Sequence, residues 1–204
     1  MNQEVFIIII TEETLPIDEF VEETVYQHCH FLYANTYASV QNVTFIGCTF
    51  EQHDFSDYTF LDCTFRGIDF SNQKFDLTKF YRNKLENCKF LGTSFYKAVL
   101  VDNHFSDCVL DFSNFSEAKS KNNRFTACRL QESYWQEVTI EKGTIFENSE
   151  LGAMDFIGTN LKGGDLSSSN LSELRIDSKK MSGLIISPAQ ASYLIQLFGV
   201  KIKD

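Results

Sequence analysis

Large apolar residues occur at every fifth position of this chain for about a hundred residues, without a change of register. The series runs Phe45, Phe50, Phe55, Phe60, Phe65, Phe70, Phe75, Phe80, Leu85, Phe90, Phe95, Leu100, Phe105, Leu110, Phe115, Ser120, Phe125, Leu130, Trp135, Ile140 and Ile145. A period of five fits neither the repeat of an α-helix nor the alternation of a β-strand. The pattern therefore indicates an internal repeat, in which Ser120 is the only position that is not large and apolar.

The residue two places before each large apolar position is usually small, as at Cys48, Cys63, Thr78, Cys88, Thr93, Ala98, Cys108, Ser113, Ala118, Cys128 and Ser133. Between residues 45 and 145, neither position holds Asp, Glu, Lys or Arg. An unpaired charge is expensive to bury, so these two positions face inward and the other three face water. His53, Tyr58, Ile68 and Gln73 are large side chains in the small slot. They indicate either a locally distorted coil or a shaped patch for a partner.

This pattern resembles the pentapeptide-repeat family over nearly the whole chain. The resemblance implies an all-β fold, a right-handed quadrilateral β-helix in which four pentapeptides form one square coil. Residues twenty apart should then stack, and two inward columns fit that spacing: Cys88, Cys108 and Cys128, and Asn83, Asn103 and Asn123. We expect the Asn side chains to hydrogen-bond along the stack, which satisfies polar groups that are otherwise expensive to bury.

The pattern predicts a single domain over residues 1–204. Residues 5–31 hold an N-terminal strand or cap and the first repeats, with Val21, Tyr26 and Phe31 inward, and residues 32–42 break the register. Residues 43–182 form the main β-helix. Large apolar positions resume one residue late at Leu151, which predicts a bulge near residues 146–150. The apolar run of residues 5–10 favours a strand that pairs with the first coil.

A short helix is predicted at residues 187–199, because Ser187 suits the N-cap, Pro188 the first turn and Gly199 the end. Its apolar surface is wide for its length. Such a helix needs two partners: the last coil and, we expect, a second subunit.

The net charge of −10 is unevenly distributed. Residues 1–65 hold eleven Asp and Glu and no Lys or Arg, whereas the remainder holds seventeen acids and eighteen bases. This is either an ordinary solvated surface or an anionic surface that meets a basic partner. It argues against nucleic acid as a ligand, because phosphates require clustered Lys and Arg.

The sequence offers no motif for catalysis. The four His residues lack metal-ligand spacing, and there is no Cys-x-x-Cys, phosphate loop or nucleophile elbow. We therefore expect no catalytic residue, no metal and no cofactor. The six Cys fit inward slots, as expected of free thiols in a reducing cytoplasm. The N-terminal apolar run is too short to cross a membrane, so no membrane association is expected.

The C-terminal residues 181–202 resemble the tail of the quinolone-resistance (Qnr-type) pentapeptide-repeat proteins, with Gln190, Ala191 and Ser192 at the helix start and an apolar–Gly–apolar exit at Gly199. The resemblance implies a cytoplasmic homodimer, joined through this helix, that imitates DNA. It implies binding to DNA gyrase or topoisomerase IV and protection from quinolones. The implied dimer residues are Tyr193, Leu194, Ile195, Leu197 and Phe198. The implied phosphate-like acidic face comprises Glu51, Asp54, Asp57, Asp62 and Asp69.

A second hypothesis is a rigid, non-catalytic scaffold for a different protein partner. The same outward faces motivate it, with His53, Tyr58 and Tyr33 as candidate contacts. An enzyme is the third hypothesis, and no motif supports it. The repeat by itself does not separate the first two hypotheses, because one fold hosts many functions.

Overall fold

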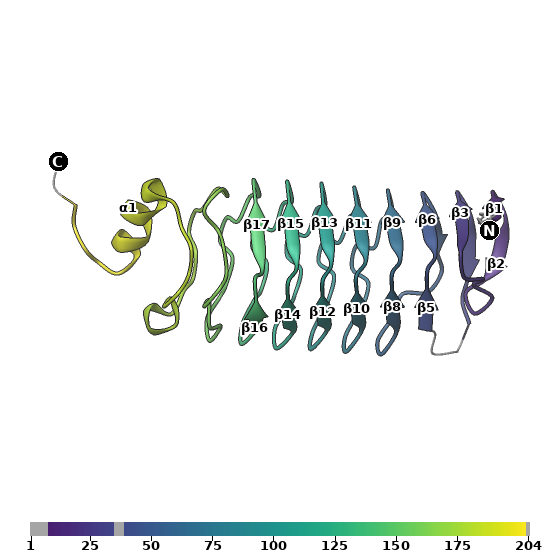
Figure 1. Cartoon of the computed structure of the whole chain (residues 1–204), viewed down its shortest axis with the longest axis horizontal. Coiled ribbons are helices and arrows are strands. Elements are labelled where there is room, and N and C mark those ends of the chain that lie inside the picture. The colour runs from purple at the N-terminus through teal and green to yellow at the C-terminus, as the bar shows by residue number, and fades with distance from the viewer. Residues whose placement is uncertain (1–7, 35–38, 203–204) are drawn as a thin grey trace, which may run out of the picture.

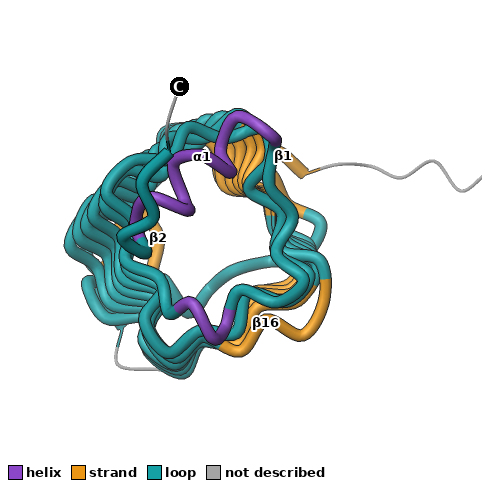
Figure 2. The backbone as a smooth tube through the Cα atoms, turned by 90° about the vertical axis from the view of Figure 1, so that its left-hand side faces the viewer, coloured by secondary structure: helices purple, strands orange, loops and turns teal. Residues whose placement is uncertain are grey.

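A computed structural model describes residues 8–34 and 39–202, which wind into one parallel β-helix with a short helix at its C-terminal end (Figure 1). Viewed along the rod, successive coils lie almost directly over one another (Figure 2). Each coil has four sides, which we name A to D in chain order. The predicted all-β quadrilateral β-helix with a C-terminal helix is confirmed.

Sides A and D are continuous parallel sheets. Side A comprises β1 (Ile8–Thr11), β3 (Thr24–Gln27), β6 (Thr44–Ile46), β9 (Thr64–Arg66), β11 (Lys84–Glu86), β13 (His104–Ser106), β15 (Arg124–Thr126) and β17 (Ile145–Glu147). Side D comprises β5 (Ser39–Gln41), β8 (Thr59–Leu61), β10 (Lys79–Tyr81), β12 (Val99–Val101), β14 (Lys119–Lys121) and β16 (Thr139–Lys142).

Sides B and C are narrower. Side B begins with β2 (Thr14–Pro16), β4 (His30–Leu32) and β7 (Thr49–Phe50) and continues as single bridges from Asp69 to Asn170. Side C consists of bridges that join Asp54, Lys74, Ser94, Asn114, Tyr134, Asp155 and Arg175 in order. Most corners between sides hold a residue with positive φ, which turns the chain sharply.

Stacked aromatic rings fill the core. Phe55, Phe75, Phe95, Phe115 and Trp135 form one column, with neighbouring ring centroids 4.5–5.5 Å apart. The predicted Asn ladder is also present: the Asn103 Oδ1 accepts hydrogen bonds from the Asn83 backbone N–H at 2.9 Å and side-chain amide at 3.0 Å. Ser120 ends this ladder, because its hydroxyl accepts from the Asn123 amide at 2.8 Å and lies 2.8 Å from the Thr144 hydroxyl.

The extra residue lies earlier than predicted. Ser120 pairs with Ile140 but Lys121 pairs with Lys142, so the register shifts at Glu141 rather than near residues 146–150. The inward position predicted for Ile145 is consequently taken by Phe146, which is fully buried. Either of two adjacent apolar residues satisfies the sequence pattern, and only pairing with β15 decides between them.

The N-terminal coil follows the prediction in part. Strand β1 pairs in parallel with β3, as expected of the apolar run, although residues 5–7 lie outside the described residues. Tyr26 and Phe31 are buried as predicted, but Val21 is exposed. Phe20 packs instead, with its ring centroid 5.0 Å from that of Phe31.

The coil around residue 53 is locally distorted. Gln52 turns inward in place of His53, which is exposed and lies 3.0 Å from the Gln73 side-chain amide. Tyr58 and Ile68 are buried in the small slot. These large slot residues therefore serve packing, apart from His53.

The C-terminal helix α1 (Pro188–Leu197) follows the short 3₁₀ helix η1 (Ser178–Lys180). Ser187 is its N-cap, as predicted, and also forms a capping box with Gln190. The Gln190 side-chain amide also donates to the carbonyls of Leu166 and Ser169, at 2.8 and 2.7 Å. These bonds fix the helix start to the last full coil.

Candidate interaction surfaces

Packed side chains fill the core, so the candidate functional sites lie on the outer surface of the rod. All six cysteines are free and buried. Burial raises the pKa of the Cys48 and Cys63 thiols to about 11, so both are protonated at neutral pH. Among the described residues, no group of three or more His, Cys, Asp or Glu is placed to hold a metal ion.

The five predicted acidic residues do not share a face. Asp54 lies on side C and Asp69 on side B, whereas Glu51, Asp57 and Asp62 lie at three different corners. Residues 51–69 span almost one complete coil, so these side chains encircle the rod. The prediction of one acidic face is therefore wrong, because a five-residue pattern specifies inside and outside but not the side of the square.

Neighbouring side chains also neutralise part of this charge. The Arg82 guanidinium donates two hydrogen bonds to Asp62, at 2.8 and 2.7 Å, and holds the pKa of that carboxyl below its usual value. Lys89 lies 3.9 Å from Asp69, whereas the only basic group beside Glu51 is the His30 ring at 3.5 Å, which is charged only when protonated. Hydrogen bonds from the Ser56 hydroxyl and from the Ser56 backbone N–H lower the pKa of Asp54.

Ion pairing between stacked coils is general beyond residue 61. The pairs are Arg66–Glu86, Arg82–Asp62, Lys89–Asp69, Lys97–Glu117, Arg124–Glu147, Arg129–Asp111 and Arg175–Asp155. They include every arginine of the chain. Each such pair is worth little energy at an exposed site, but it cancels charge locally.

The first coils carry the unbalanced negative charge. We name as the acidic end the exposed carboxylates of Glu12, Glu13, Asp18, Glu19, Glu22, Glu23, Glu51, Asp54 and Asp57. The first Lys or Arg in the chain is Arg66, so no cationic side chain other than His lies within residues 12–57. The negative surface is thus one end of the rod, adjacent to β1 and far from α1 (Figure 1).

The predicted dimer residues divide into two groups. The Leu194 side chain is only 2% exposed, so it packs on its own chain and cannot form the dimer seam as predicted. Tyr193 is half-buried, and its hydroxyl accepts a hydrogen bond from the Leu174 backbone N–H at 2.8 Å. Ile195, Leu197 and Phe198 are 43%, 40% and 42% exposed and remain available to a partner.

The sequence reasoning missed a group of lysines on side D. Lys119, Lys121, Lys142, Lys162 and Lys180 are exposed on consecutive layers of that side. Lys119 and Lys121 lie two residues apart on β14, so the alternation of that strand already points both side chains outward. The inserted Glu141 hides their alignment with Lys142 and Lys162.

No helix within the described residues is both long enough and apolar enough to span a membrane.

Two family profiles match the repeats. The profile described as "Pentapeptide repeat region" matches residues 78–156, and that described as "Pentapeptide repeats (8 copies)" matches residues 142–172. Together with the four-sided β-helix, these matches show that residues 78–172 are pentapeptide repeats. A search of curated proteins returned no match.

The chain is also similar to solved structures of QnrB1, a plasmid-mediated fluoroquinolone resistance protein. One trypsin-treated QnrB1 variant superposes with a TM-score of 0.58 at 20% identity, covering 97% of this chain and 98% of QnrB1. A second gives a TM-score of 0.53 at 20% identity, covering 98% and 100%. At this identity the similarity establishes a shared fold.

Proposed function

We propose that this protein is a non-catalytic, cytoplasmic homodimer that binds DNA gyrase or topoisomerase IV in place of DNA and thereby modulates the enzyme or protects it from quinolones. The observation that carries the proposal is the fold, a β-helix that matches QnrB1 over nearly the full length of both chains. The C-terminal helix adds an exposed apolar surface suited to a second subunit.

The acidic end supplies the negative charge that a DNA-binding enzyme would meet. Its nine carboxylates lie on the first coils with no Lys or Arg between them. Opposite charge between two surfaces speeds their encounter and excludes wrong partners. On this proposal the topoisomerase contacts the acidic end, and the paired acids at Asp62 and Asp69 contribute little.

A gyrase supercoiling assay, with and without a fluoroquinolone, tests the proposal. The purified protein should inhibit supercoiling or relieve drug inhibition at micromolar concentration or below. Glu12→Gln with Glu23→Gln should weaken the effect several-fold. The matched control is Glu132→Gln with Glu173→Gln, because all four residues are exposed glutamates at positive φ.

No effect of the unaltered protein on gyrase or topoisomerase IV from the source organism would remove the proposal. Equal loss in both double variants would remove the acidic end as the contact surface. In that case the effect would depend on total charge alone.

The second candidate function is a rigid scaffold for a different protein, and Leu77 and Phe112 favour it. They are the only large apolar residues at positive φ in the described chain, with φ of 60° and 59°. Both are also largely exposed, at 46% and 49%. Left-handed geometry costs a non-glycine residue about 1–2 kcal/mol of stability. Exposed apolar side chains at these two positions therefore lower the stability of the fold.

A pull-down that uses the unaltered protein and a Leu77→Asn, Phe112→Asn variant tests the scaffold. A reproducible partner other than a topoisomerase, lost in the variant, would support this function. A partner that is retained in the variant would exclude these two residues as its contacts.

A further inference from the structure

The outward side chains in one column of side D change from apolar to cationic along the rod. Strand register stacks Leu61, Tyr81, Val101, Lys121 and Lys142 in one outward column. The first three are apolar or aromatic and half-buried, whereas the last two are exposed cations. A molecule lying along this column therefore meets an apolar strip and then a basic strip.

The basic strip comprises the five lysines Lys119, Lys121, Lys142, Lys162 and Lys180. Lys121 and Lys142 are direct register partners, a like-charge contact that disfavours the folded state. None of the five forms an ion pair with Asp or Glu within the described chain, although every arginine does. Carboxylates also lie beside the strip, at Asp102, Glu117, Glu137, Glu141 and Asp177. The lysines nevertheless leave unpaired positive charge on this side of a chain whose net charge is −10.

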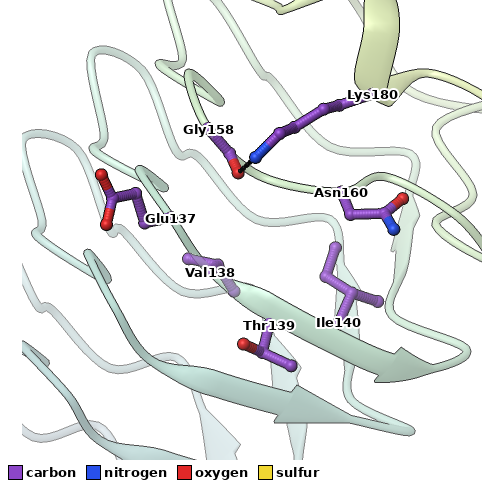
Figure 3. Close-up of a pocket in the computed structure, with 7 residues that line it drawn as sticks. All are labelled: Glu137, Val138, Thr139, Ile140, Gly158, Asn160 and Lys180. Atoms are coloured by element: carbon purple, nitrogen blue, oxygen red, sulfur yellow. Dashed lines mark hydrogen bonds between the residues drawn. The ribbon is translucent and has the colours of Figure 1, made fainter.

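A hollow lies at the C-terminal end of the strip. It encloses about 360 Å³ between Glu137, Thr139, Ile140, Asn160 and Lys180 (Figure 3). Gly158 also lines it, and the Lys180 ammonium donates a hydrogen bond to the Gly158 carbonyl. The hollow lies at the basic end of side D and is large enough for one side chain of a bound segment.

We propose that side D is a docking surface for an acidic segment of a partner protein, bound extended along the rod with apolar residues over Leu61, Tyr81 and Val101 and carboxylates over the lysines. Seven layers run from β8 to residues 180–182, and the six spacings between them make a length of about 29 Å at the usual strand spacing. An extended peptide of about nine residues covers that distance. This surface is separate from the acidic end and from α1, so it adds a partner site to the proposed function.

The apolar half of the column favours a polypeptide over nucleic acid. A nucleic-acid backbone carries charge at regular intervals, so the part of it that lies over Leu61, Tyr81 and Val101 would meet only one cation, Lys79 of β10. The strip also lacks arginine, which forms the bidentate contacts with phosphate. The negative charge of the rod would repel a long polyanion, whereas a short acidic segment meets only the local lysines.

Fluorescence anisotropy with a labelled synthetic peptide tests the proposal. The peptide is about nine residues long, with alternating Val and Thr in the first half and Glu in the second. A peptide of the same composition with mixed order and a single-stranded oligonucleotide of equal charge serve as comparisons. We expect the ordered peptide to bind at least tenfold more tightly than either comparison at low salt.

Lys121→Glu with Lys142→Glu should weaken binding of the ordered peptide tenfold or more. The matched control is Lys74→Glu with Lys84→Glu, which makes the same charge change on sides C and A. Circular dichroism and melting of each variant verify that the rod is intact. Because these are exposed side chains, both double variants should fold.

Four outcomes overturn the proposal. They are no binding of the ordered peptide, equal binding of the mixed peptide, tighter binding of the oligonucleotide, and equal weakening in the control variant. Light scattering at the same salt supplies a further check. Self-association that the Lys121 and Lys142 changes abolish, without any peptide binding, would assign the surface to the acidic end of a second copy instead.

Discussion

Some single residues in this rod have structural roles that the five-residue pattern does not reveal. Ser120 interrupts the apolar series because the Asn ladder needs an acceptor at its end. Corner residues adopt positive φ in almost every coil, so local backbone strain recurs along the rod. Most of these corners hold Asn, Asp, Gly or Glu, and Leu77 and Phe112 stand out against that background.

The Asn ladder predicts a large stability effect at its centre. Asn103→Ala removes the acceptor for the Asn83 backbone N–H and the donor to the Phe80 carbonyl. It leaves buried polar groups unsatisfied, so we expect a loss of about 2–4 kcal/mol in the free energy of unfolding by urea. Asn170→Ala, at an exposed residue, is the control and should lose less than about 1 kcal/mol. Equal losses would show that the ladder adds no stability.

A substitution at Phe112 should have the opposite effect on the free energy of unfolding. Phe112→Asn places a residue that tolerates left-handed geometry at φ 59° and removes an exposed apolar side chain. We expect the unfolding free energy to rise by about 1 kcal/mol. Tyr134→Asn, an exposed aromatic outside the left-handed positions, should bring no gain. A stability loss at Phe112 would mean that its ring makes a necessary contact in the rod.

At the scale of elements, the C-terminal helix has one side committed to the rod and another side open. Leu194 and the Gln190 amide hold it to the last coils. Ile195, Leu197 and Phe198 face water together with Val200 and Ile202 beyond the helix. Exposed apolar residues gathered at one end of a rod are typical of an interface.

Two variants of the C-terminal helix distinguish its packing on the rod from its contact in the proposed dimer. For the proposed dimer, Ile195→Glu with Phe198→Glu should give a monomer in light scattering while the β-sheet signal in circular dichroism is kept. Leu194→Ala should instead lower the unfolding free energy by about 2–4 kcal/mol, because it opens a cavity under the helix. A double variant that remains dimeric would place the subunit contact elsewhere.

At the scale of the whole molecule, the rod is solid and its charge is segregated. Aromatic columns fill the interior, and the six thiols are enclosed between coils. The acidic end and the side D lysines lie at different positions along the rod. On the two proposals made above, partners would contact separate outer surfaces of the rod.

The buried thiols make stability depend on pH in the alkaline range. Folding raises the pKa of Cys48 and Cys63 to about 11, so their contribution is complete below the unfolded pKa near 9 and is lost as pH rises toward 11. Each thiol should contribute on the order of 2 kcal/mol to that loss. Urea unfolding at pH 8 and 10.5 measures it. A Cys48→Ala, Cys63→Ala variant should lose less between the two pH values, and an equal loss would assign the dependence to other groups.

The twenty-residue coil came from the resemblance to pentapeptide repeats, and the amino-acid sequence by itself determined most of the inward positions and the caps of the C-terminal helix. It did so because burial penalises charge at every repeat, and because capping depends on neighbours in the chain. Only the tertiary structure decided which outward residues share a side. The acids from Glu51 to Asp69 encircle one coil, and Glu141 shifts every later column, so that Lys121 meets Lys142. Surface neighbours are set by the pairing of coils, and one inserted residue changes that pairing while the local apolar pattern stays satisfied.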